Sequence, residues 1–162
     1  MGIKTIHYLS LVVLFILACP ANAQYKKVPP FRMIRQDGRI FKADSLPVGK
    51  PIIIIYFSPD CEDCQQFMDK ISNSIDDFKS ASIAMITFLP VESLSQFIER
   101  NNLNKYPNFY VGTEGSNFFV RDFYNIGQLP FVAVYTKDGD LVKQYSGKEI
   151  DFNDFLEHLR NL

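Results

Sequence analysis

The chain has 162 residues, which is enough for one domain with a hydrophobic core but not for two. With 47% hydrophobic and 22% charged residues, its composition is that of a globular protein and excludes a disordered chain. With a formal net charge of −1, the composition gives no indication of a nucleic-acid partner.

The first 23 residues have the pattern of a secretory signal peptide. Lys4 gives a positive start, residues 9–18 form a short apolar run, and residues 21–23 (ANA) form a small-x-small cleavage pattern. The run is about half of the ~20 apolar residues that a membrane-spanning helix needs. We therefore predict that residues 1–23 are removed on export, with an uncleaved anchor or a buried N-terminal helix as the alternative.

The signal-peptide prediction determines which cysteines the exported protein keeps. Cys19 ends the stretch ILAC, an imperfect match to the bacterial lipidation motif, so a lipid anchor at Cys19 stays open as a second alternative. Removal of the signal leaves Cys61 and Cys64, which in an oxidising compartment form a disulfide unless they are kept reduced. The exported chain carries 16 Lys and Arg against 18 Asp and Glu, a net charge of −2.

The predicted domain begins after a polar, proline-bearing linker at residues 24–30. Residues 31–35 and 39–42 are short strand candidates around an Asp-Gly dipeptide, which favours a tight hairpin turn. Residues 51–57 form a continuous apolar run rich in β-branched residues. This pattern predicts a strand that is buried on both faces of a sheet.

A helix and a second strand unit follow. Residues 62–78 place apolar side chains at helical spacing, with Glu62 and Asp63 in the first turn, where acids complement the helix dipole. Residues 82–89 form another buried-strand candidate, and residues 91–102 a helix with its exit. The β-α-β-α order predicts parallel strands joined by crossover helices.

The remaining third of the chain completes an α/β domain over residues 31–162. Residues 117–124 are predicted to form one or two helical turns. Residues 131–136 and 141–146 are predicted to pair as an antiparallel hairpin across a Lys-Asp-Gly-Asp turn. Asp151 is a good N-cap for a final helix whose apolar residues share one face.

This order of elements resembles the thioredoxin fold, a central mixed sheet flanked by helices, here with an N-terminal β-hairpin extension. The signal, the hairpin and the stretch FSPDCEDC (residues 57–64) resemble the exported TlpA/ResA-like thioredoxins, in the Pro-Asp-Cys-x-x-Cys form common in Bacteroidetes. The resemblance covers roughly residues 31–162. It implies a thiol-disulfide oxidoreductase, a reductase, in the periplasm or cell envelope of a Gram-negative bacterium.

The resemblance also implies the roles of four residues. Cys61 falls on the attacking cysteine and Cys64 on the resolving one. Leu129 and Pro130 fall on a loop in which the proline follows a cis peptide bond, and whose backbone pairs with substrate polypeptide beside the CxxC motif. The implied partners are proteins that carry disulfides and a membrane-embedded protein that supplies electrons through thiols.

Departures from the family pattern concern the redox chemistry. Asp60 replaces the usual Trp before the first cysteine, and Glu62 and Asp63 are the intervening pair. Ile55 stands where thioredoxins keep a buried acid that helps to deprotonate the resolving cysteine. The three carboxylates disfavour the Cys61 thiolate, whereas a helix N-terminus favours it. We expect a pair that is more reducing than a disulfide-introducing enzyme, whose potential is about −120 mV.

A CxxC pair can also be half of a metal site or a structural clip. A zinc site usually needs four Cys or His ligands, and the exported chain adds only His158, with Asp60 or Glu62 as further ligands. We therefore expect no metal, and no cofactor besides the disulfide of the two cysteines. A purely structural disulfide between these two cysteines would close a very short loop, and such a disulfide stabilises a fold only slightly.

Two other functions stay open beside the oxidoreductase. In the first, the fold serves as a binding or assembly module, and the disulfide only stabilises it. In the second, the domain is a peroxiredoxin-like peroxidase. The second is disfavoured, because Ser58 stands where a Thr-x-x-Cys site would have its threonine.

Overall fold

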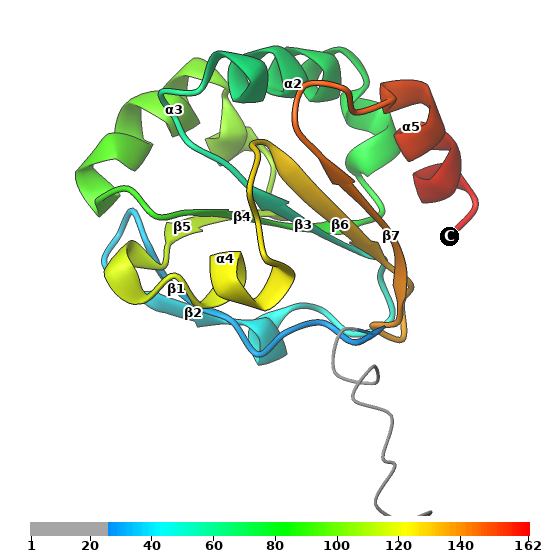
Figure 1. The fold of residues 1–162 in the computed structure, drawn as a ribbon, viewed down its shortest axis with the longest axis horizontal. Coiled ribbons are helices and arrows are strands. Elements are labelled where there is room, and N and C mark those ends of the chain that lie inside the picture. The colour runs from blue at the N-terminus through cyan, green and yellow to red at the C-terminus, as the bar shows by residue number, and fades with distance from the viewer. Residues whose placement is uncertain (1–25) are drawn as a thin grey trace, which may run out of the picture.

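The computed structural model describes residues 26–162, so the predicted signal peptide and Cys19 lie outside the described residues. A seven-stranded mixed sheet has the order β2-β1-β5-β4-β3-β6-β7 and carries helices on both faces (Figure 1). The strands are β1 (Arg32–Arg35), β2 (Ile40–Lys42), β3 (Ile52–Tyr56), β4 (Ser82–Thr87), β5 (Phe109–Thr113), β6 (Phe131–Tyr135) and β7 (Leu141–Ser146). The α-helices are α2 (Glu62–Asn73), α3 (Leu94–Arg100), α4 (Phe119–Tyr124) and α5 (Phe152–Arg160).

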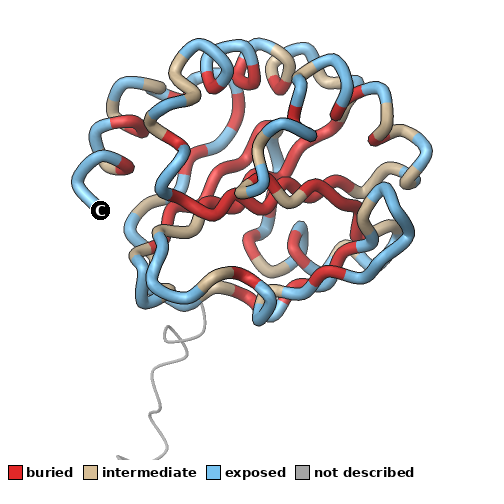
Figure 2. Tube along the Cα trace, turned by 180° about the vertical axis from the view of Figure 1, so that it is seen from behind, coloured by how far each residue is buried: buried red, intermediate tan, exposed pale blue. Residues whose placement is uncertain are grey.

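The apolar run in the first half of the chain forms β3, at the centre of the sheet. It pairs in parallel with β4 and antiparallel with β6. Ile53 and Ile55 contribute to the core under α2, α3 and α5, whereas Ile54 and Tyr56 face the core that includes α4. All four are at most 1% exposed, and Figure 2 shows the central strands buried. The prediction of a strand buried on both faces is confirmed.

The N-terminal hairpin is continuous with this sheet. β1 and β2 pair antiparallel around Gly38, whose φ of 78° suits the turn that the Asp-Gly dipeptide predicts. The described end of the predicted linker packs against the domain: the backbone N–H of Val28 donates to Gly139 O at 3.2 Å, and Lys27 forms a bridge with Asp140. These contacts attach the chain before β1 to the turn between β6 and β7.

The sequence pattern does not predict β5. This strand has only five residues and lies between two 3₁₀ turns, Leu103–Lys105 and Gly115–Asn117. Gly112 limits its apolar run to three residues, which is too short to predict a strand. It pairs in parallel with β4 and antiparallel with β1. Because β5 joins the hairpin to the central strands, the hairpin extends the sheet.

The helices are shorter than the sequence pattern predicts. The helix expected over residues 62–78 ends at Asn73, and Ile75–Phe78 form a separate 3₁₀ turn. The helix expected after Pro90 begins with a 3₁₀ turn, Val91–Ser93, before α3. Apolar spacing does not distinguish a 3₁₀ turn at a helix end from a further α-helical turn.

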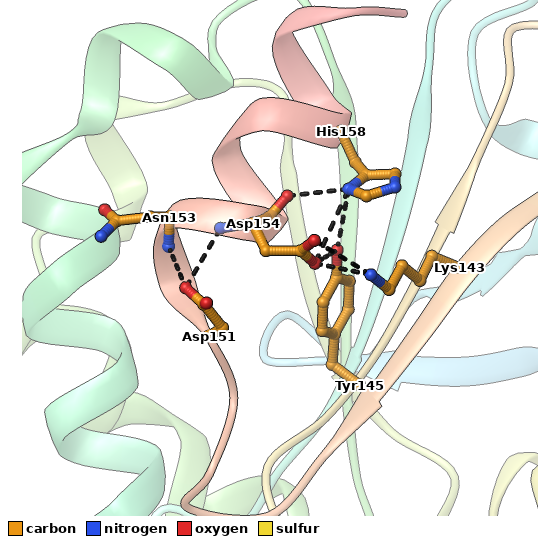
Figure 3. A network of polar contacts seen from close by, with 6 residues as sticks. All are labelled: Lys143, Tyr145, Asp151, Asn153, Asp154 and His158. Carbon is orange, nitrogen blue, oxygen red and sulfur yellow. Dashed lines mark hydrogen bonds and ion pairs between the residues drawn. The ribbon is translucent and has the colours of Figure 1, made fainter.

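A polar network attaches α5 to β7 (Figure 3). Asp151 caps the helix as predicted, and its carboxylate accepts the N–H groups of Asn153 and Asp154 at 3.0 and 3.2 Å. The Asp154 carboxylate in turn accepts from Lys143 Nζ and Tyr145 Oη on β7, each at 2.8 Å to Oδ2. These hydrogen bonds keep the pKa of Asp154 below its usual value, so the carboxylate is ionised at neutral pH.

The close contact between β5 and β1 yields the first prediction. A Cβ atom at Gly112 would lie 2.8 Å from Met33 Cγ and 2.9 Å from the backbone oxygen of Ile34. Gly112→Ala is therefore expected to push β1 away from β5 and to lower the free energy of unfolding by about 1–3 kcal/mol. Urea unfolding measures the change. The matched control is Gly127→Ala, because a Cβ atom at Gly127 meets no heavy atom within 4 Å. Equal stability losses in the two variants would contradict the prediction.

Candidate active site

The loop between β3 and α2 presents the first cysteine. The backbone N–H of Cys61 donates to Ser58 O at 3.1 Å and closes a turn. The side-chain amide of Gln65 donates to Pro59 O at 2.5 Å, and Arg100 of α3 donates to Gln65 Oε1 at 3.1 Å. The loop is thus held by its own helix and by α3. No sequence signal marks Gln65 or Arg100 as positioning residues, because their partners are created by the fold.

Cys61 is the N-cap residue of α2, and its side chain is partly exposed. Its Sγ atom accepts the backbone N–H of Cys64 at 3.3 Å. Unpaired N–H groups and the positive end of the helix dipole surround a sulfur in this position. The sulfur of Cys61 is therefore both accessible and in contact with the helix N-terminus.

Cys64 lies one turn further along α2 and is 1% exposed. Burial raises the pKa of the Cys64 thiol most, the hydrogen bond with Cys61 raises it further, and a backbone hydrogen bond from Ser58 opposes the shift. Cys64 is therefore protonated at neutral pH. The two cysteines thus differ in access, because Cys61 is partly exposed and Cys64 is buried.

No buried carboxylate lies beside Cys64 within residues 26–162. Ile55 is buried in the same apolar cluster as Cys64. The buried acid of the described chain is Glu114, whose carboxylate accepts from Tyr56 Oη at 2.7 Å and from the Val120 N–H at 2.8 Å. Tyr56 and Ile55 are neighbours in β3 and point to opposite faces. The sheet therefore separates Glu114 from Cys64.

The Leu129-Pro130 peptide bond is cis, as the resemblance implies. Leu129 and Cys61 both pack against the apolar cluster that contains Cys64. The structure thus brings the proline loop and the CxxC motif to the same core, although 65 residues separate Cys64 from Leu129 in the chain.

Gly147 supports the proline loop and was not singled out by the sequence pattern. Its N–H donates to Pro130 O at 2.9 Å, and the Ser146 hydroxyl donates to Gln128 O at 3.2 Å. Gly147 has a φ of 74°, and a Cβ atom there would lie 2.4 Å from Gln128 Oε1. A glycine directly after the predicted strand is the one signal that could have indicated this contact.

The three carboxylates around Cys61 differ in their surroundings. Asp60 and Glu62 are exposed, whereas Asp63 is partly buried. Asp63 lines a hollow of about 400 Å³ that also includes Leu129 and Lys148. Asp60 lines a second hollow, of about 420 Å³, beside α3. Asp60 and Asp63, which flank Cys61 in the chain, therefore border two different hollows.

The described part of the chain contains two free cysteines, Cys61 and Cys64. Among them, no group of three or more His, Cys, Asp and Glu side chains is arranged to hold a metal ion. His158 lies on α5, where its Nδ1 atom is 2.8 Å from Asp154 O and 3.3 Å from Tyr145 Oη (Figure 3). No helix in the range 26–162 is long and apolar enough to cross a membrane.

The buried thiol predicts a pH-dependent resolving step. Below its raised pKa, the thiolate fraction of Cys64 grows about tenfold with each pH unit, and the rate of its attack on a Cys61 mixed disulfide grows with it. Stopped-flow release of a coloured aromatic thiol from Cys61, between about pH 6 and about pH 9, measures this rate. Cys64→Ala is the control and should release nothing. A rate that is flat over this range would contradict the assignment of Cys64 as a protonated resolving thiol.

A model of the thioredoxin-like domain matches residues 44–162. No curated protein sequence matches the chain.

Several solved structures share the fold. A secreted disulfide oxidoreductase of Mycobacterium tuberculosis, described as homologous to Escherichia coli DsbE, is 19% identical with a TM-score of 0.68, covering 88% of this chain and 100% of that chain. A thiol-disulfide oxidoreductase of Bacteroides fragilis is 13% identical with a TM-score of 0.66, covering 82% and 99%. The exposed lipoprotein thioredoxin of Streptococcus pneumoniae is 17% identical with a TM-score of 0.60, covering 83% and 100%. These likenesses show the fold and confirm the predicted α/β class.

Proposed function

Because the chain belongs to the thioredoxin-like domain family, we propose that it is a thiol-disulfide oxidoreductase that reduces protein disulfides through Cys61 and Cys64. One observation carries the proposal: a partly exposed Cys61 caps a helix with its sulfur, and a buried Cys64 lies one turn behind it. The loop that contains Leu129 and Pro130 packs against the same core and supports it.

The reaction proceeds in two exchanges. The Cys61 thiolate attacks one sulfur of a substrate disulfide, forms a mixed disulfide and releases the first substrate thiolate. Cys64 then loses its proton and attacks Cys61 Sγ, which forms the Cys61–Cys64 disulfide and releases the second substrate thiolate. Two electrons have passed from the dithiol to the substrate. The protein therefore needs no cofactor beyond this pair, and a thiol donor must reduce the pair again.

Substrate polypeptide is proposed to lie along the cis-proline loop. Leu129 precedes the cis bond, and its backbone would pair with the residues that flank the substrate disulfide. The hollow lined by Asp63, Leu129 and Lys148 lies where such a segment would extend. Asp60, Glu62 and Asp63 are proposed to tune the redox potential through their charge.

We place this activity in the periplasm or cell envelope of a Gram-negative bacterium. The support is the signal pattern of residues 1–23, together with structural neighbours that include a secreted oxidoreductase and an exposed lipoprotein. A membrane-embedded thiol protein would supply the electrons. A lipid anchor at Cys19 is the alternative to release by cleavage.

The central test is reduction of insulin by the chain that begins at Gln24. The wild type is expected to reduce insulin disulfides above the background given by dithiothreitol. Cys61→Ser should fall to that background, because the attacking sulfur is gone. Cys64→Ala should still attack but should accumulate mixed disulfides on Cys61, which mass spectrometry identifies.

The same assay separates the oxidoreductase from a binding or assembly module. If the wild type is no more active than Cys61→Ser and its disulfide resists dithiothreitol, the pair is structural and the proposed function is wrong. Thermal unfolding of both proteins shows whether loss of activity comes from loss of the fold.

The acidic surroundings predict a reducing potential. We expect the Cys61–Cys64 couple to lie well below the value of about −120 mV that is typical of a disulfide-introducing enzyme. Replacing the three carboxylates with Asp60→Asn, Glu62→Gln and Asp63→Asn removes like charge around the thiolate and should make the couple more oxidising. Equilibration with glutathione buffers measures both potentials. The opposite shift in the triple variant would contradict the tuning role.

A further inference from the structure

An apolar groove lies at the end of the sheet opposite the candidate active site. It has a volume of about 890 Å³ and includes Ile52, the first residue of β3, whereas Cys61 follows the other end of that strand. Three segments line it: residues 28–32 before and in β1, residues 42–48 after β2, and the turn 137–139 between β6 and β7. We refer to this surface as the basal groove.

Val48 makes the basal groove unusual for the surface of a folded domain. Its side chain is 98% exposed, between Pro47 and a Gly49 with a φ of 81°. Phe31 and Leu46, at 1% and 6% exposure, form the apolar floor behind it. An exposed aliphatic side chain beside a large apolar hollow, rimmed by charged residues, is typical of a protein or membrane contact.

Basic residues surround this groove in a domain that is otherwise acidic. The groove is lined by Arg32, Lys42 and Lys137. The segments that form it are flanked in the chain by three more cations, Lys26, Lys27 and Lys50. All six are exposed, and the nearby acids are Asp44, Asp138 and Asp140. This end of the domain thus has a net charge of +3. Residues 26–162 have a net charge of −2, because Lys4 is the only charged residue before them, so the rest of the domain carries −5.

We propose that the basal groove docks on the surface of an anionic phospholipid bilayer. The exposed Val48 enters the interface between headgroups and acyl chains. Five of the cations contact anionic headgroups, whereas Lys27 stays paired with Asp140. Positive charge set around an exposed aliphatic side chain favours a lipid surface over an uncharged protein partner. Docking in this way leaves Cys61 on the side of the domain that faces away from the bilayer. The proposal does not depend on the redox function.

The position of the chain before β1 supports the same orientation. Contacts of Lys27 and Val28 with the β6–β7 turn attach this segment beside the basal groove. Residues 19–25 separate it from the apolar run of residues 9–18, and seven residues span at most about 25 Å. A chain that keeps this run, or that carries a lipid on Cys19, therefore holds the basal groove close to the membrane.

A single tryptophan tests the docking directly, because the chain contains none. Val48→Trp in the full chain is mixed with phosphatidylglycerol vesicles whose acyl chains are brominated, at low salt. Tryptophan emission is expected to shift to the blue and to be quenched at least about twofold. Phosphatidylcholine vesicles and high salt should each remove most of the effect, because the attraction is electrostatic.

Two further variants are the controls. Phe119→Trp places the tryptophan on α4, which follows the end of β5 that is remote from the basal groove. Phe119 is 41% exposed, so this tryptophan is also accessible to solvent. Its emission should not change with vesicles, because α4 does not take part in the proposed docking. The second control adds Lys42→Glu and Lys137→Glu to the Val48→Trp variant. This reversal of charge at the groove should abolish the quenching. Insulin reduction in vesicle-free buffer should be unchanged in all variants, which distinguishes failure of docking from failure of the redox function.

Four results would overturn the docking proposal. The first is unchanged Val48→Trp emission with anionic vesicles. The second is equal quenching by neutral and anionic vesicles, which would assign the contact to the apolar run of residues 9–18. The third is equal quenching of Phe119→Trp. The fourth is emission that is already blue-shifted without vesicles, which would mean that the chain itself covers the groove.

Discussion

Burial of β3 on both faces of the sheet is the constraint on which the candidate site depends. Four consecutive side chains, Ile53 to Tyr56, alternate between the two cores, and none is more than 1% exposed. A shift of one residue in register would exchange every one of these side chains between the cores. The end of β3 is therefore held in place, and the loop from Ser58 to Cys61 begins from a fixed point. Gln65 and Arg100 then hold the loop against α2 and α3.

The chemical difference between the two cysteines follows from the start of one helix. At the N-cap, Cys61 meets unpaired N–H groups and remains accessible. Three residues later the helix has made almost one turn, and Cys64 points into the core between sheet and helix. The position that brings the Cys64 sulfur close to Cys61 also buries it, and this burial raises the pKa of the Cys64 thiol. Ile55 provides no carboxylate beside Cys64, and Glu114, the buried acid among residues 26–162, lies on the other side of the sheet.

Sequence patterns predicted the parts of the fold that have a local cause. The β-branched run of β3, the Asp-Gly turn of the hairpin, the Asp151 cap and the cis bond before Pro130 are each indicated by neighbouring residues or by a family motif. β5 could not be recognised, because Gly112 breaks its apolar run and its place is set by pairing with β1 and β4. The role of Gln65 could not be assigned for the same reason, since it comes from contacts with an irregular loop and with α3. For Gly147, the only local indication was its place directly after a predicted strand.

The direction of the strands separates two kinds of surface. β3, β4 and β5 are parallel, so their carboxyl ends share one edge, where the Cys61 loop and its exposed acids lie. Their amino ends share the opposite edge, where Ile52 borders the basal groove. An acidic reactive edge repels an anionic surface, whereas a basic apolar edge is attracted to one. A domain with this distribution of charge, held at an anionic bilayer, would orient with Cys61 toward the solvent. The exposed acids beside Cys61 would then also keep the two cysteines away from the membrane and available to proteins in solution.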